Sequence, residues 1–274
     1  MKALLAQLDP KVGDKEGNIR KMEKALAGRD VDLALFGELY LSGYMARDRF
    51  PRLAEPLDGP SVKRVARLAK KTGAHILFGM PERDGHRLYN TAMLVAPGGE
   101  TWAYRKIHLA NFGPFEEKHH FMPGDNPVLA KTALGRIGLQ ICYDAFFPEL
   151  SKHYALGGAE ILAVISASPA TSKSMFDKVL PARAVENAAF VLYANLVGTE
   201  LNVVFQGGTQ AIGPRGEELD KARDFEEDLV EVAVDTAILP AARRGRPTAR
   251  DTRPELWSPR TLGSDRDGAG RTAK

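Results

Sequence analysis

Residues 138–149 read GLQICYDAFFPE and contain Cys142, the only cysteine among the 274 residues of the chain. The apolar residues before Cys142 predict a buried strand, and Pro148 predicts that a helix begins a few residues later. Cys142 is therefore expected at the turn after a strand, where reactive side chains are often presented. Because free cysteines are also commonly small buried hydrophobes, this stretch alone leaves both roles open.

A catalytic cysteine needs a base or a cation close to it, because a thiol with an ordinary pKa of about 8.5 is mostly protonated at neutral pH. One candidate base is Glu38, which follows the apolar run of residues 31–36. A carboxylate at the edge of an apolar environment tends to have a raised pKa, which suits an acid or a base. Taken singly, a glutamate at a strand end is usually only a solvated charge.

One candidate cation is Lys106, in the stretch WAYRKIHL of residues 102–109. Its alternating pattern predicts a strand in which Lys106 shares a face with Tyr104 and His108. A lysine beside a reacting carbonyl stabilises the negative oxygen that develops there, typically by about 3 to 4 kcal/mol. By itself, a lysine on a strand face is also commonly only a solvated charge, so the conjunction with Glu38 and Cys142 carries the hypothesis.

In the first part of the chain, apolar runs typical of strands alternate with amphipathic stretches typical of helices. Later in the chain, expected strands are followed by other expected strands. This mixture favours an α/β protein with two stacked sheets covered by helices. The expected strands are 3–8, 31–36, 75–80, 88–95, 102–109, 137–141, 161–165, 191–197, 207–214 and 229–234. The expected helices are 18–27, one that Pro60 opens, one that begins near Pro148, and 181–189.

A chain of this length with 44% hydrophobic residues can bury a substantial core, and we expect one globular domain over residues 1–240. From about residue 241 arginines and prolines intersperse and the periodicity is lost. Such a segment cannot form its own core, so residues 241–262 are expected to be extended and to pack on the body or on a second subunit. Residues 263–274 are expected to be a disordered tail.

Composition and the chain ends limit the classes of function. A net charge of +3 is too small to argue for a nucleic-acid partner. The N-terminal residues do not resemble an export signal, and no stretch approaches a membrane span. Since a single cysteine cannot form an internal disulfide, a reducing cytoplasm is the expected compartment.

Three motifs in a fixed order resemble those of the nitrilase, or carbon-nitrogen hydrolase, superfamily. Residues 36–44, FGELYLSGY, resemble its glutamate motif, although the family more often has proline where Gly37 stands. Residues 104–109, YRKIHL, resemble the lysine motif, and residues 138–149 resemble the cysteine motif. The resemblance, which runs from Lys2 to about Trp257, implies an α-β-β-α sandwich, homodimers or higher homo-oligomers, and no metal or organic cofactor.

The resemblance also implies a Glu-Lys-Cys triad made of Glu38, Lys106 and Cys142. In that reading Glu38 takes the thiol proton, the sulfur attacks an amide carbon, and Lys106 binds the oxyanion together with the backbone N–H of Tyr143. It further implies a second glutamate in the loop after the lysine motif. Glu117 is the better candidate for it in the stretch FEEKHHF of residues 115–121, and Glu116 is its rival.

The substrate is less well defined by sequence. Nitrile-cleaving members usually have Trp-Glu after the cysteine, whereas this chain has Tyr143 and Asp144, which favours an amide. Residues 166–169 and 195–208 are similar to the glutaminase domains of glutamine-dependent NAD synthetases, but those domains usually carry an acidic residue where Tyr143 stands. We therefore expect a small amide other than free glutamine, with Tyr44 and Ser168 lining the pocket.

Other functions are also consistent with these motifs. They are an ammonia-supplying glutaminase subunit of a separate synthetase, an N-carbamoyl hydrolase, a nitrilase, and a non-catalytic interaction protein of the same fold. Two adjacent histidines, His119 and His120, also invite a metal site. No further cysteine or histidine stands at ligand-like spacing, so no metal is expected.

Overall fold

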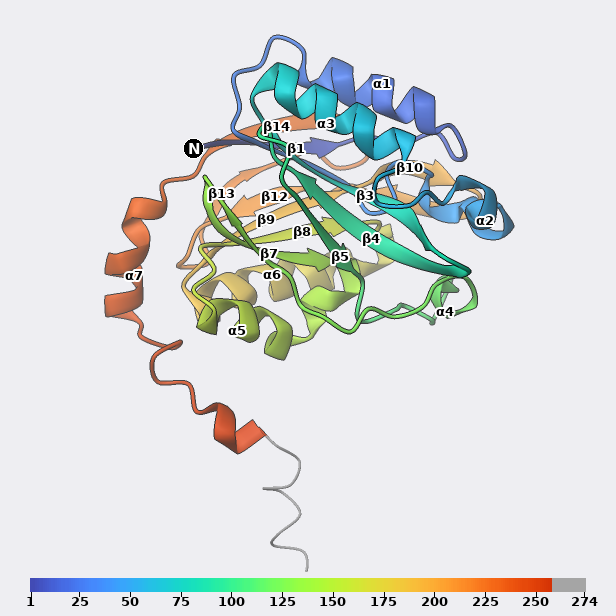
Figure 1. Cartoon of the computed structure of the whole chain (residues 1–274). Coiled ribbons are helices and arrows are strands. Elements are labelled where there is room, and N and C mark those ends of the chain that lie inside the picture. The colour runs from blue at the N-terminus through green and yellow to red at the C-terminus, as the bar shows by residue number, and fades with distance from the viewer. Residues whose placement is uncertain (258–274) are drawn as a thin grey trace, which may run out of the picture.

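The computed structural model describes residues 1–257, which form two stacked six-stranded sheets with helices on both outer faces (Figure 1). The α-β-β-α sandwich expected from the sequence is confirmed. In the first sheet the order is β14 (Asp228–Ala233), β1 (Lys2–Gln7), β2 (Leu33–Phe36), β3 (His75–Asp84), β4 (Arg87–Val95) and β5 (Thr101–Arg105). In the second it is β13 (Glu218–Lys221), β12 (Gln210–Ile212), β9 (Phe190–Asn195), β8 (Ile161–Ser166), β7 (Gly135–Ile141) and β6 (Leu129–Thr132).

Two helices cover each sheet, as the outer layers of Figure 1 show. The first sheet is covered by α1 (Lys15–Leu26) and α3 (Pro60–Thr72), and the second by α5 (Pro148–Leu156) and α6 (Lys173–Asn187). A two-stranded sheet of β10 (Val197–Glu200) and β11 (Val203–Gln206) and the short helices α2 (Phe50–Leu53), α4 (Glu117–His120) and α7 (Leu239–Gly245) complete the fold. Its 3₁₀ turns are η1 (Tyr44–Arg49), η2 (Cys142–Phe146), η3 (Ala170–Ser172), η4 (Thr236–Ile238) and η5 (Pro254–Trp257).

Alternation along the strands divides the core into two layers. On β1, Leu4 belongs to the cluster under α1 and α3, while Leu5 belongs to the cluster between the two sheets. Successive side chains of a strand point to opposite faces, so every residue of this strand after Lys2 is buried by one layer or the other. The second sheet has parallel pairings of β7 with β8 and of β8 with β9, which explains the continuous apolar runs seen in the sequence.

Helix α3 shows how the sequence signals produce an element. Pro60 lies in its first turn, where the fixed φ of proline suits a helix and the missing N–H costs nothing. Val62, Val65 and Leu68 are buried on one face, and Gly73 ends the helix with φ +77°. This left-handed conformation is one that glycine adopts without steric cost.

Several expected boundaries are wrong. Strand β5 ends at Arg105, so Lys106 and the residues after it do not continue the predicted strand to residue 109. Helix α6 begins at Lys173 and contains Pro181 in its interior, where the sequence suggested a start. The short strands β6, β10, β11 and β13 were not predicted, because runs of four residues carry little periodicity.

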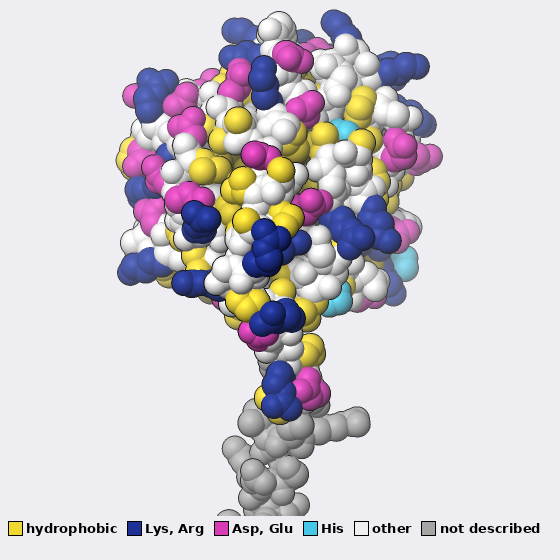
Figure 2. All heavy atoms as spheres, turned by 90° about the vertical axis from the view of Figure 1, so that its left-hand side faces the viewer, with side chains coloured by type: hydrophobic (Ala, Val, Ile, Leu, Met, Phe, Trp, Pro, Cys, Tyr) yellow, Lys and Arg dark blue, Asp and Glu magenta, His cyan; other side chains and the backbone are white. Residues whose placement is uncertain are grey.

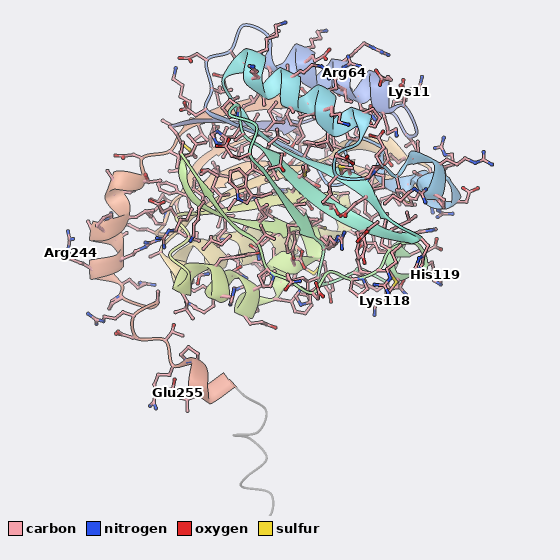
Figure 3. All side chains as sticks on the ribbon, in the orientation of Figure 1. Lys11, Arg64, Lys118, His119, Arg244 and Glu255 are labelled. Carbon is pink, nitrogen blue, oxygen red and sulfur yellow. The ribbon has the colours of Figure 1, made fainter. Side chains whose placement is uncertain are left out.

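The C-terminal segment differs in part from the extended chain expected from residue 241, because α7 is helical over Leu239–Gly245. Leu239 is buried, and the Arg243 guanidinium donates hydrogen bonds to the carbonyls of Ala159 and Ala188 at the body. Beyond α7 the chain runs away from the body, and Arg244 and Glu255 point outward (Figures 1 and 3). The last part of the predicted segment, 258–262, and the predicted tail, 263–274, lie outside the described residues.

Figure 2 shows the face of the molecule that carries α7, where basic and acidic side chains are interspersed rather than gathered by sign. Over residues 1–257, the structure contains no helix that is long and apolar enough to cross a bilayer.

Candidate active site

Three buried ionisable side chains meet beside the carboxyl end of β2: Glu38 follows that strand, Lys106 follows the edge strand β5, and Glu117 lies on α4. Lys106 Nζ donates to Glu38 Oε1 and to Glu117 Oε1, each at 2.7 Å. Lys106 and Glu38 are 0% exposed and Glu117 is 3% exposed, so these charges compensate one another without help from solvent. The structure thus brings together the lysine and both glutamates singled out from the sequence.

Glu38 is fixed by backbone as well as by side chains. It lies two residues beyond β2, where its N–H donates to the carbonyl of Ser166 at the end of β8. Its Oε1 also accepts from Asn90 Nδ2 at 2.7 Å, and its Oε2 accepts from the N–H of Ala167 at 2.9 Å. Asn90, on β4, is a site residue that the sequence reasoning missed, because an isolated asparagine within a strand carries no motif.

Gly37 stands where the resembling motif more often has proline. A β-carbon at this position would lie 2.4 Å from the side chain of Leu196, far inside van der Waals contact. Leu196 is fully buried directly after β9, so the space that a larger residue would need is already filled. A residue with a β-carbon at position 37 would therefore require Leu196 to move.

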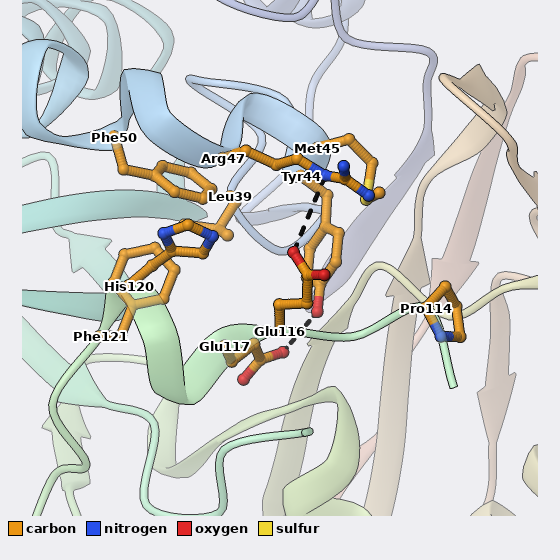
Figure 4. Close-up of a pocket in the computed structure, with 10 residues that line it drawn as sticks. All are labelled: Leu39, Tyr44, Met45, Arg47, Phe50, Pro114, Glu116, Glu117, His120 and Phe121. Atoms are coloured by element: carbon orange, nitrogen blue, oxygen red, sulfur yellow. Dashed lines mark hydrogen bonds and ion pairs between the residues drawn. The ribbon is translucent and has the colours of Figure 1, made fainter. Parts of the chain in front are cut away.

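Glu117 begins the short helix α4 and is held from three sides. Besides Lys106, it accepts hydrogen bonds from the Tyr44 hydroxyl at 2.6 Å and from the N–H of Ala110 at 3.1 Å (Figure 4). Burial raises the pKa of Glu117 to about 7; Lys106 and Tyr44 oppose this rise, and the charge of Glu38 adds to it. Its neighbour Glu116 is half exposed and faces Arg47 instead, at 4.0 Å.

The ammonium state of Lys106 is stabilised by its two partners. Burial by itself lowers the pKa of a lysine, because a charged group loses its hydration. At Lys106 the charges of Glu117 and Glu38 outweigh burial and raise the pKa above its ordinary value. The lysine therefore remains a cationic hydrogen-bond donor at neutral pH.

Cys142 lies at the start of η2, directly after β7, as the sequence pattern predicted. Its backbone has φ +49°, a left-handed conformation that residues other than glycine rarely adopt. Burial raises the pKa of the Cys142 thiol, the charge of Glu38 raises it further, and Lys106 lowers it. The resting thiol is thus protonated at neutral pH, so attack by the sulfur requires that a base remove this proton.

Asp144 joins the turn after the cysteine to the segment after the lysine. Its carboxylate accepts from the Tyr104 hydroxyl at 2.8 Å, from the N–H of His108 at 3.0 Å and from the N–H of Ile141 at 3.1 Å. His108 Nδ1 lies 2.8 Å from the same carboxylate, and its ring stacks on Phe147. Tyr104 and His108 therefore share a partner, whereas Lys106 faces the two glutamates, so the prediction that Lys106 shares a strand face with Tyr104 and His108 is wrong.

Cys142 opens into a mainly apolar pocket of about 270 Å³. Ser168 lines this pocket as expected, and so does Tyr143. Tyr44 is not among its described lining residues and instead lines, together with Glu117, a much smaller hollow of about 20 Å³ (Figure 4). The residues that line it include Ala110, Phe112, Phe115, Cys142, Tyr143, Phe146, Ser168, Ser172, Met175 and Phe176.

The adjacent histidines take different positions. The ring of His120 packs against Phe50 with centroids 5.4 Å apart, whereas His119 lies near the end of α4 at the edge of the molecule (Figure 3). Within residues 1–257, no three His, Cys, Asp or Glu side chains are arranged so that they could hold a metal ion.

The sequence matches the family model described as carbon-nitrogen hydrolase over residues 2–244. It is 34% identical over 262 residues to a protein of Pseudomonas protegens named hydrolase in pqqF 5'region, with 94% of this chain and 90% of the relative covered. It is also 34% identical to the glutamine-dependent NAD(+) synthetase of Thermotoga maritima, covering 86% of this chain but only 42% of the synthetase.

Solved structures agree with these similarities. One is a variant of the amidase from Nesterenkonia sp. AN1, whose active-site cysteine carries the acetamide moiety of fluoroacetamide. It superposes with a TM-score of 0.82 at 28% identity and covers 94% of this chain and 97% of its own. Fold and site thus define a hydrolase that acts on carbon–nitrogen bonds. The chain belongs to the carbon-nitrogen hydrolase family.

Proposed function

We propose that this protein hydrolyses a small non-peptide amide to a carboxylate and ammonia through a thioester on Cys142. The observation that carries the proposal is the placement of Lys106 Nζ at 2.7 Å from both Glu38 and Glu117, at the buried site where Cys142 opens into its pocket. This arrangement supplies a nucleophile, a base and a fixed positive charge for an oxyanion.

Acylation begins when Glu38 accepts the proton of the Cys142 thiol and the sulfur attacks the amide carbon. The carbonyl oxygen becomes negative and is stabilised by Lys106 Nζ and by the backbone N–H of Tyr143 in the first turn of η2, where N–H groups lack intrahelical partners. The carbon–nitrogen bond then breaks, and the nitrogen takes the proton from Glu38 and leaves as ammonia.

Deacylation uses the same groups, but Glu38 now takes its proton from water and returns a proton to the sulfur. Glu38 accepts a proton from a water molecule, whose oxygen attacks the thioester carbon. The carbon–sulfur bond breaks, the carboxylic acid is released, and the sulfur regains a proton from Glu38. Glu117 orients Lys106 throughout, and Tyr44 positions Glu117 rather than contacting the acyl group.

A glutaminase subunit of a separate synthetase is the strongest alternative, because a relative named as an NAD synthetase is 34% identical. Free glutamine carries an α-ammonium and an α-carboxylate, which need partners of opposite charge in the pocket. Among the described lining residues none is an Asp, Glu, Lys or Arg. This composition supports an amide without charges near the acyl chain.

We also propose a compartment and an oligomeric state for the enzyme. We place it in the reducing cytoplasm as a homodimer or higher homo-oligomer that needs no cofactor. The described residues that follow α7 are largely exposed and leave the body, which supports a role for them as a contact with a second subunit. Size-exclusion chromatography with light scattering, on the full chain and on a chain ending at residue 246, tests this assignment.

An ammonia-release screen tests the reaction itself. Its substrates are short primary amides, monoamides of dicarboxylates, N-carbamoyl compounds, nitriles and glutamine, and intact mass is recorded during turnover. We expect ammonia from primary amides and a mass increase equal to one acyl group on Cys142. Preferential turnover of nitriles or N-carbamoyl compounds would select those alternatives, and no ammonia or adduct from any class would remove the catalytic proposal.

The Tyr44 hydroxyl provides a test of the role of Glu117. Tyr44→Phe removes a donor that favours the charged carboxylate, so the pKa of Glu117 should rise further above about 7. If ionised Glu117 is the active form, activity increases with pH through this pKa, and the acid limb of the kcat profile should move about one unit upward. The plateau at high pH should change little.

Tyr40→Phe is the matched control for this shift. Tyr40 is also fully buried, and its hydroxyl has no hydrogen-bond partner among the described residues. Its removal should leave the acid limb where it is in the parent protein. Identical profiles for Tyr44→Phe and Tyr40→Phe would contradict the assigned link between Tyr44 and Glu117.

A further inference from the structure

We propose that the Cys142 pocket selects primary amides whose acyl group is apolar and as large as an arylalkyl chain, and rejects acyl groups that end in a carboxylate. This inference rests on the proposed function and names its substrate class. Three features of the pocket support this substrate class: its lining, its size and the packing of its walls.

The lining is built almost entirely of apolar and aromatic side chains. Aromatic rings and a thioether form its walls, and the polar side-chain groups of the described lining residues are the thiol and the hydroxyls of Ser168, Ser172 and Tyr143. Hydroxyls can bind an amide or a water molecule but cannot neutralise a buried carboxylate. A charged acyl terminus would therefore lose its hydration without gaining a counter-charge, whereas an apolar chain would gain from burial. The walls are Phe112, Phe115, Tyr143, Phe146, Met175 and Phe176.

The size of the pocket exceeds what a short aliphatic acyl group can fill. Its volume is about 270 Å³. For comparison, an apolar cavity of about 150 Å³ is sufficient to bind benzene. A phenyl ring joined to the reacting carbonyl by one or two methylenes therefore fits between Cys142 and the outer wall, while an acetyl group leaves most of the space empty.

Contacts among the rings hold the walls in place. Phe112 meets Tyr143 with centroids 4.9 Å apart, and Phe146 meets Phe176 at 5.0 Å, both in edge-to-face geometry. These pairs link the loop before α4 to η2, and η2 to α6. An aryl guest adds further edge-to-face contacts, which such clusters favour over a purely aliphatic chain.

Relative kcat/KM values for neutral and charged amides test the inference in the parent protein. Acetamide, hexanamide, 3-phenylpropanamide and the monoamide of adipate form the panel; the last differs from hexanamide only by a carboxylate in place of the terminal methyl. We expect about a fourfold gain per buried methylene, and hence about a 250-fold gain from acetamide to hexanamide, which has four more methylenes. 3-Phenylpropanamide should be at least as good, and the adipate monoamide at least about 100-fold poorer than hexanamide.

Met175→Arg adds a positive charge to the pocket lining, at a residue that is partly exposed to solvent. Met175 is 47% exposed, so a guanidinium there can remain hydrated while reaching a carboxylate in the pocket. The ratio of kcat/KM for adipate monoamide over hexanamide should rise about tenfold or more. Met122→Arg makes the same chemical change at a methionine that is 48% exposed and outside the pocket lining, and should leave this ratio unchanged.

Two kinds of failure are distinguishable. A preference of the parent protein for acetamide or for the adipate monoamide, with ammonia release intact, overturns the substrate class but keeps the amidase. Absence of ammonia and of any adduct on Cys142 with every amide overturns the proposed function itself. If Met175→Arg does not fold, as judged by circular dichroism, the ratio measured for the parent decides the matter.

Discussion

Cys142→Ala is expected to abolish ammonia release from the best amide, with kcat falling on the order of 10⁵-fold or more. Removal of a covalent nucleophile leaves only the effects of binding and oxyanion stabilisation, which do not replace the missing bond-forming atom. The fold should survive, because Cys142 is small and almost buried and alanine keeps an apolar side chain there. Ammonia release, intact mass and thermal unfolding are measured on the same preparation.

Ser166→Ala is a useful companion to this variant. Ser166 lies beside Cys142 and its hydroxyl lowers the pKa of the thiol, but it offers no nucleophile in the proposed mechanism. It should keep most of the turnover and still form the acyl adduct. Turnover by Cys142→Ala above about one per cent of the parent rate would show that another group attacks the amide.

Lys106→Met is expected to impair both catalysis and stability. The variant retains two buried carboxylates but loses the cation between them, and breaking a buried ion pair in this way typically costs about 3 to 5 kcal/mol. Loss of an oxyanion donor should lower kcat by about 10²- to 10³-fold. Urea unfolding gives the free energy of unfolding, and ammonia release gives the rate.

The pH dependence of this instability has a definite sign. Loss of Lys106 removes a contribution that lowers the pKa of Glu117, which is already about 7 in the parent protein. A carboxyl whose pKa is raised on folding makes the folded state bind more protons, so stability falls as pH rises from the unfolded pKa to the folded one. Parent and variant should therefore be closest in stability below pH 7 and diverge above it.

Lys21→Met is the matched control, because Lys21 pairs with Glu227 at the surface, where both side chains are about one-third to one-half exposed. Such pairs typically contribute less than about 1 kcal/mol. Equal losses of stability in the two variants would contradict the view that burial makes the Lys106 contacts costly to break.

The architecture could be predicted from local signals in the sequence, whereas the four ionisable site residues were named from the resemblance of three ordered motifs to those of the family. Buried parallel strands produce apolar runs, and chemistry at their carboxyl ends places Glu38 and Cys142 directly after such runs. The choice of Glu117 over Glu116 followed from resemblance, and the structure now gives it a physical basis, since only Glu117 contacts Lys106.

Features that depend on packing across long sequence separations were not predicted. The hydrogen bond of Asn90 to Glu38 joins residues 52 positions apart, and that of Tyr44 to Glu117 spans 73 positions. No periodicity in either segment encodes such a contact. The proline inside α6 was misread for the same reason, because tertiary packing overrode its usual effect on a helix.

At position 142, the left-handed backbone conformation means that the residue best for stability is not the residue required for activity. A residue with a β-carbon typically loses about 1 to 2 kcal/mol in this conformation, and glycine would relieve that strain. Glycine, however, cannot attack an amide. Evolution or engineering for thermal robustness alone would therefore favour discarding the nucleophile, and only selection for turnover keeps a thiol at this turn.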